Sequence, residues 1–196
     1  MAIVINGSGT VTGVSVGGLP DGIVDTDMIA NNAVTSAKST GIEYAAQFRI
    51  TASFTGDAAP ISSNWEKVDS TGQGILGTWA DPSSGVFTFP ATGFYLVSFG
   101  ALIQTTGTNQ YMENKIQLTT NNGGAWHYVA TGDANISDTT ASNYEAQGYC
   151  QTLVDVTDTA QVKVRFDMNI ESGSCNIIGN STRNQTYVTL IRLGDT

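Results

Sequence analysis

The residues best suited to nucleophilic or metal chemistry are one histidine, His127, and two cysteines, Cys150 and Cys175. Nucleophilic catalysis would require His127 to activate a serine or a thiol. The chain contains no Gly-x-Ser-x-Gly turn, and the spacing of the cysteines gives a Cys–His pair no support. These residues are also too few for a histidine-based zinc site or a disulfide framework. The sequence favours two small buried thiols, with a disulfide between them as the alternative.

Acidic residues offer two further kinds of site. Closely spaced oxygen ligands suit calcium, but no calcium-binding loop motif occurs, and Asp and Asn are common in turns because they stabilise turns themselves. The candidate calcium ligands are Asp133, Asn135, Asp138, Asp155 and Asp158. A polysaccharide-degrading enzyme needs two carboxylates in a cleft, whereas Asp167 and Glu171 are predicted on the polar face of one strand without a partner. We therefore predict no enzyme activity, no metal and no cofactor.

Exposed aromatic side chains are the remaining candidates for function. Aromatic rings beside Asn and Asp can stack on sugars while the polar groups bind the hydroxyls. Four aromatic residues near predicted loops or strand ends are the candidate receptor contacts: Tyr111, Trp126, Tyr128 and Tyr144. The alternative is that these rings fill the core of a sandwich or an interface between subunits.

Composition limits the partners. The chain of 196 residues has 17 acidic and 8 basic residues, a formal charge of −9, and only 13% charged residues. Its bases form no cluster that could hold phosphates, so we expect no nucleic-acid binding. No apolar run approaches the ~20 residues that span a bilayer, and the first residues lack the pattern of a secretory signal. We expect synthesis in a cytoplasm and no membrane insertion.

The pattern of apolar residues predicts an all-β fold. Residues 162–170 alternate strictly between apolar and polar, so we expect Phe166 in the core and Asp167 toward solvent or a subunit boundary. Residues 48–54 show the same period. Asn-Asn-Gly-Gly at 121–124 predicts a hairpin turn, because Asn and Gly tolerate positive φ. About ten strands without a helical stripe favour a jelly-roll β-sandwich, which manages exposed strand edges.

Residues 85–99 are the most informative segment, with the sequence Gly-Val-Phe-Thr-Phe-Pro-Ala-Thr-Gly-Phe-Tyr-Leu-Val-Ser-Phe. Pro90 ends one strand because it cannot donate to a sheet, and Gly93 permits the turn that follows. The pattern resembles the G-x-F-x-x-P-x-x-G-x-Y signature of the tumour-necrosis-factor/complement globular-head superfamily. This resemblance implies a trimeric jelly roll that binds partners and carries out no chemistry. Residues 94–103 also have more apolar surface than one sandwich face can bury, which predicts a subunit interface.

The last strand supports the same resemblance with one departure. Residues 185–193 resemble the final strand of that superfamily, but Thr186-Tyr187 stands where the superfamily has an aromatic-Gly pair.

Residues 1–43 differ from the rest of the chain. They contain no aromatic residue and a single base, Lys38, so they cannot form a core of their own. Residues 19–38 resemble the D-G-x-V-x-x-x-x-(L/I)-A-x-x-A-V-T-x-A-K units of phage tail-fibre and virion appendage proteins, especially those of phages of marine cyanobacteria. The resemblance implies an extended N-terminal arm over 1–43 and a jelly-roll head over 44–196. The candidate virion anchor residues are Ile23, Val24, Met28, Ile29 and Val34.

These observations predict a phage structural protein, a homotrimeric fibre or appendage at the virion surface. Its arm would bind other virion proteins, and its head would project outward to adhere to a glycan or protein of the host surface. Two alternatives remain open: a capsid decoration or head-fibre protein with a purely structural role, and a polysaccharide-degrading fibre enzyme.

Overall fold

The computed structural model describes residues 41–105, 109–136, 144–171 and 175–196, so the candidate anchor residues lie outside the described residues. The described residues form strands and contain no helix of the length and apolarity needed to cross a membrane. The strands are β1 (Ala45–Ile50), β2 (Phe54–Thr55), β3 (Trp65–Lys67), β4 (Phe87–Thr88), β5 (Gly93–Thr105), β6 (Asn109–Thr119), β7 (His127–Ile136), β8 (Tyr144–Val156), β9 (Lys163–Ile170), β10 (Asn176–Ile177) and β11 (Tyr187–Gly194).

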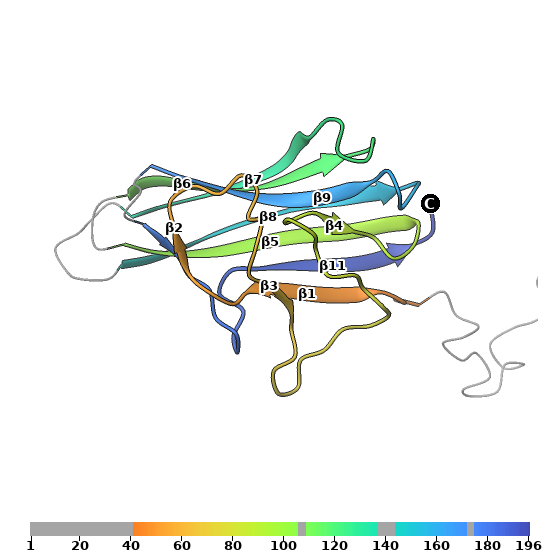
Figure 1. Ribbon diagram of the computed structural model, residues 1–196, viewed down its shortest axis with the longest axis horizontal. Coiled ribbons are helices and arrows are strands. Elements are labelled where there is room, and N and C mark those ends of the chain that lie inside the picture. The colour runs from red at the N-terminus through yellow and green to blue at the C-terminus, as the bar shows by residue number, and fades with distance from the viewer. Residues whose placement is uncertain (1–40, 106–108, 137–143, 172–174) are drawn as a thin grey trace, which may run out of the picture. The chain divides into compact units, whose positions relative to one another are not determined.

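The strands form two antiparallel sheets that pack face to face (Figure 1). The seven-stranded sheet has the order β2-β10-β5-β11-β1-β3, and β8 pairs with the other edge of β5. The four-stranded sheet has the order β4-β9-β6-β7. Many neighbours are far apart in the sequence, such as β1 beside β11 and β4 beside β9. This arrangement is a jelly-roll sandwich, and it confirms the predicted fold class.

The central strand of the larger sheet is β5, which is apolar on both faces. Tyr95 and Phe99 point into the core and are fully buried, whereas Phe94 lies on the opposite face and is 42% exposed. Gly93 begins the strand at φ 135°, and a Cβ there would lie 2.3 Å from the carbonyl oxygen of Gly194. Only glycine fits this start of the strand without strain.

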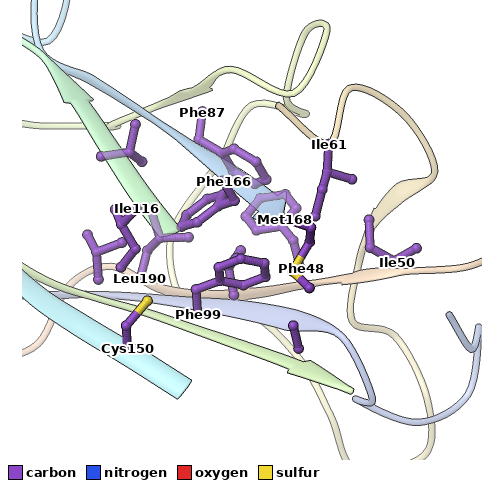
Figure 2. Packing of buried hydrophobic residues seen from close by; sticks show 14 of the residues in the cluster. Phe48, Ile50, Ile61, Phe87, Phe99, Ile116, Cys150, Phe166, Met168 and Leu190 are labelled. Carbon is purple, nitrogen blue, oxygen red and sulfur yellow. The ribbon is translucent and has the colours of Figure 1, made fainter. Parts of the chain in front are cut away.

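The core between the sheets is rich in aromatic rings, and Phe166 of β9 lies at its centre (Figure 2). Its ring centre is 5.1 Å from that of Phe87 and 5.2 Å from that of Phe99. Phe166 is fully buried, so the strict alternation of residues 162–170 predicted its direction correctly.

The expectation for the next residue was wrong. Asp167 points away from the core, yet it is only 2% exposed. The Gln117 amide and the Tyr128 hydroxyl both bond to its carboxylate, so neighbouring side chains on the outer face of the sheet cover it.

The alternation over residues 48–54 does not form one strand. β1 ends at Ile50, and Phe54 belongs to β2, which pairs with β10. After the end of β1, the backbone of Ala52 packs closely against that of Gly179. A Cβ on Gly179 would lie only 2.5 Å from the carbonyl carbon of Ala52. The apolar–polar alternation of the sequence continues past the end of β1 because Phe54, in β2, packs against the same core.

The predicted hairpin turn connects β6 and β7. Asn122 and Gly123 have φ of 56° and 92°, as the Asn-Gly pattern indicated. A register shift then places Gln117 opposite Tyr128 and Ile116 opposite Ala130. This bulge turns Tyr128 outward while Ala130 packs against the core, so the two residues do not share a face.

Candidate functional site

The four aromatic residues predicted to contact a receptor do not form one site. Trp126 directly precedes β7 and Tyr128 is its second residue, and both contact side chains on the outer face of the four-stranded sheet. Tyr111 lies near the start of β6 in the same sheet and is 44% exposed. Tyr144 begins β8 in the larger sheet and packs against the core. The structure therefore brings two of the four together.

Trp126 and Tyr128 belong to a polar network that crosses three strands. The Arg165 guanidinium lies 4.4 Å from the centre of the Trp126 ring, and its Nε donates a hydrogen bond to Gln117 Oε1 at 2.7 Å. Gln117 Nε2 donates to Asp167 Oδ2 at 2.5 Å. The Tyr128 hydroxyl donates to the same oxygen at 3.3 Å. These contacts fix the orientation of both aromatic rings.

The Tyr128 ring lies across β6 with one face toward solvent. Tyr128 is opposite Gln117 on β6, and its hydroxyl reaches Asp167 on β9, the strand beyond. Lys115 Nζ lies 5.2 Å from the centre of the ring. Because 60% of the residue remains exposed, part of this ring forms an apolar platform on a polar sheet face, and the Lys115 ammonium lies over the ring.

An ion pair lies beside this platform. Lys115 Nζ is 2.6 Å from Glu113 Oε2, and Asn169 Nδ2 donates to the same oxygen at 2.8 Å. The hydrogen bond with Lys115 lowers the pKa of Glu113 and raises the pKa of Lys115. Both groups therefore stay charged over a wide pH range.

Asp167 is the unusual group of the network. Burial raises its pKa above the ordinary value, against the opposing effect of Arg165. Its Oδ2 accepts two hydrogen bonds, while its buried Oδ1 has no partner among the described residues. This side chain is covered and cannot act as an acid on a substrate, so it offers no half of a glycosidase pair with Glu171.

The outer face of the seven-stranded sheet is different in character. We call it the large-sheet face and define it by the outward apolar residues of β5, β8 and β11, namely Phe94, Leu96, Leu102, Tyr149, Leu153, Tyr187 and Ile191. Of these, Phe94, Tyr149 and Leu153 are 42%, 51% and 63% exposed. Exposed apolar side chains gathered on one face are typical of an interaction surface.

Strand register arranges the large-sheet face in rows. Leu96 lies between Leu153 on β8 and Ile191 on β11, which gives an apolar row. Two positions along, Ser98 lies between Gln151 and Thr189, which gives a polar row.

The third row is aromatic. Gly100 lies between Tyr149 and Tyr187, and a Cβ on Gly100 would lie 3.1 Å from Tyr187 Cε1. The glycine thus makes room for the Tyr187 ring on the sheet. The three rows thus place apolar or aromatic side chains on either side of a polar row.

The candidate nucleophiles are unsuited to catalysis. Cys150 and Cys175 are buried and unpaired, so the preferred interpretation of two buried thiols is confirmed and the disulfide is not formed. Burial raises the pKa of Cys150 to about 12 and also raises that of Cys175, which keeps both in the unreactive thiol form. His127 begins β7 in an exposed position.

The candidate calcium ligands are not gathered in the described part of the chain. No group of three or more His, Cys, Asp or Glu side chains there could hold a metal ion. Asp158 stabilises a turn, since its Oδ1 accepts a hydrogen bond from the Ala160 backbone at 2.8 Å. Asp138 lies outside the described residues.

Solved structures identify this sandwich. Eiger TNF from S. frugiperda superimposes with a TM-score of 0.58 at 12% identity, over 79% of this chain and 95% of that one. The fold is a TNF-like jelly roll. Murine APRIL, at pH 5.0 and at pH 8.5, gives TM-scores of 0.53 and 0.52 at 10% and 9% identity, over 76% of this chain and 98% of APRIL. No protein-family model and no curated protein matches the sequence.

The TNF-like jelly roll agrees with the fold that the signature at residues 85–99 implied. Several residues of these two faces were not identified from the sequence. Arg165 appeared only as one polar residue of an alternating strand, and nothing in the sequence linked it to Trp126. The sequence did not single out Tyr149 and Leu153, because β8 alternates as any half-buried strand does.

Proposed function

We propose that this protein is a homotrimeric structural component of a phage virion, which anchors through residues 1–43 and displays its jelly-roll head outward for adhesion to the host. The observation that carries the proposal is the large-sheet face, where Leu153 is 63% exposed beside Leu96 and Ile191. A protein that worked as a monomer would leave these side chains in water.

Trimer formation would bury the large-sheet face and leave the four-stranded sheet facing outward. The two faces differ in character. The large-sheet face exposes phenylalanine, leucine and tyrosine, whereas the four-stranded sheet exposes Tyr128 beside a polar network in which Gln117 and Asp167 are covered. Three outward copies would convert weak contacts with a cell surface into useful avidity.

The arm has a separate role in the proposal. Residues 1–43 lack aromatic residues, so their order would come from other copies or from a docking site on the particle. Their resemblance to virion appendage segments supports anchoring through Ile23, Val24, Met28, Ile29 and Val34.

The experiment supplies three proteins during phage assembly: the full chain, residues 44–196, and an unrelated folded domain fused to residues 1–43. Antibodies against each then probe purified particles. We expect the full chain and the fusion on particles, and residues 44–196 to remain unbound. Incorporation of residues 44–196 at the level of the full chain would assign anchoring to the head, and absence of the full chain from particles would refute the virion role.

A further inference from the structure

Not every cation of the four-stranded sheet has an ion-pair partner among the described residues, although acidic residues outnumber bases in the chain. Four described bases lie within ion-pair distance of carboxylates: Arg49, Lys67, Lys115 and Arg192. Arg165 and Lys163, two residues apart on β9, form no such pair among the described residues. Lys163 instead donates to Asn122 Oδ1. On the same face, the Asp167 carboxylate interacts electrostatically with Arg165 without forming an ion pair, and Glu113 pairs with Lys115.

Arg165 is nevertheless held in place. Its guanidinium lies over the Trp126 ring at 4.4 Å, and its Nε donates to Gln117. Gln117 is 5% exposed and is itself fixed by Asp167, so the support is rigid. The two terminal nitrogens make no hydrogen bond to a described residue, and such a pair of parallel donors fits the two oxygens of a carboxylate.

Tyr128 lies on the same sheet face as this guanidinium, in the row that Gln117 shares with Arg165. Gln117 separates the two residues in the register, so their backbones are two strand spacings apart, about 10 Å. The Tyr128 ring leans toward β9 because its hydroxyl bonds to Asp167. An aromatic face fixed in advance binds a flat ligand without the entropy loss of ordering a loose side chain.

We propose that Tyr128 and Arg165 bind a carboxylate-bearing sugar, such as the uronic acid of an acidic polysaccharide. The sugar ring stacks on Tyr128, its carboxylate pairs with the terminal nitrogens of Arg165, and Lys163 adds positive charge nearby. A neutral sugar would offer no carboxylate to the terminal nitrogens of Arg165. A polyphosphate would meet the acidic charge of the rest of the chain with too few bases. The inference rests on the adhesive part of the proposed function and is independent of trimer formation.

The test compares two ligands that differ only in the carboxylate, methyl β-glucuronide and methyl β-glucoside. Saturation-transfer NMR on the full chain should detect the glucuronide with a dissociation constant of about 1 mM. The glucoside should bind about tenfold more weakly, since one charge-assisted hydrogen-bonded pair is lost. Equal binding of the two ligands, or binding of neither, would overturn the proposal.

Four variants locate the site. Tyr128→Ala and Arg165→Gln should each weaken glucuronide binding about tenfold, and Arg165→Gln should remove the preference over the glucoside. Tyr128→Phe keeps the ring but loses its bond to Asp167, so its binding should fall between that of wild type and that of Tyr128→Ala. Arg183→Gln removes the same charge from an exposed site between β10 and β11 and is the control. Unchanged binding in Tyr128→Ala or Arg165→Gln would contradict the assignment.

The mass of each variant in solution separates this inference from the proposed function. Trimers that do not bind the glucuronide would refute only the sugar site. Monomers that bind it would refute only the trimer.

Discussion

Asp167 shows how far a single residue can depart from a pattern that is otherwise correct. The alternation of β9 turns its side chain away from the core, yet the Tyr128 ring and the Gln117 amide enclose it. A carboxylate in this environment is destabilised when charged, which is why burial raises its pKa. Its place in the Arg165 network suggests that it orients those side chains at some cost in stability.

The first prediction concerns Asp167→Asn, which keeps the shape and removes the charge. The folded state has the higher pKa, so wild-type stability falls as pH rises from the ordinary value of 3.8 through the folded-state pKa and stays lower above it. The variant lacks this loss. Relative to wild type it should gain about 1.4 kcal/mol for each unit by which the folded pKa is raised. Urea denaturation at about pH 3 and about pH 7 measures this gain. A difference independent of pH would show that Asp167 titrates normally.

A second prediction compares two neighbours on β9. Phe166→Ala should reduce the free energy of unfolding by about 3–5 kcal/mol, because the ring is fully buried among Phe87, Phe99 and Trp65. Asn169→Ala, which removes an amide from the outer face, should cost about 1 kcal/mol. Chemical denaturation measures both. Similar losses would mean that the strand register is wrong.

At the level of elements, the start of β5 depends on Gly93. Gly93→Ala would place a methyl group 2.3 Å from the Gly194 carbonyl oxygen at a φ of 135°. Gly56→Ala is the matched control, since its φ is also positive, at 82°, but nothing lies within 4 Å of the added atom. We expect Gly93→Ala to cost about 1–3 kcal/mol more than the control. The difference in thermal unfolding between the two variants tests this. Equal losses would mean that the contact with β11 relaxes freely.

The strands differ in how well the sequence predicts them. β9 was predicted closely because it alternates over its whole length against a buried core. β1 was extended too far, since Phe54 continues its period from another strand. The bulge opposite Ile116 and Gln117 was not foreseen, because it changes which face Tyr128 occupies without changing the residue types.

Candidate sites are harder to predict than strands. Of the four candidate receptor contacts, Trp126 and Tyr128 lie on one face of the four-stranded sheet, whereas Tyr144 packs against the core. The sequence did not single out Arg165, which contacts Trp126. Contacts across a sheet depend on register, and register depends on bulges and strand order that no local pattern specifies. The signature at residues 85–99 predicted the jelly roll because it combines a strand end, a glycine turn and the first residues of β5.

At the scale of the whole molecule, the sandwich has two outer faces of different character. The large-sheet face carries Tyr149, Leu153 and Tyr187, and in our proposal it joins copies of the chain. The outer face of the four-stranded sheet carries Tyr128 and Arg165, and in our proposal it binds the host-surface ligand. The separation explains how one small sandwich could both assemble and adhere, because neither activity uses the residues of the other.

The most direct test of this account is the mass of the full chain in solution at micromolar concentration, measured by mass photometry or sedimentation. We predict a trimer for wild type and a folded monomer for Leu153→Glu, which places a charge in the apolar row. Val129→Glu, which alters an exposed apolar residue of β7, should remain a trimer. A stable monodisperse wild-type monomer, or a trimer unaffected by Leu153→Glu, would contradict assembly through the large-sheet face.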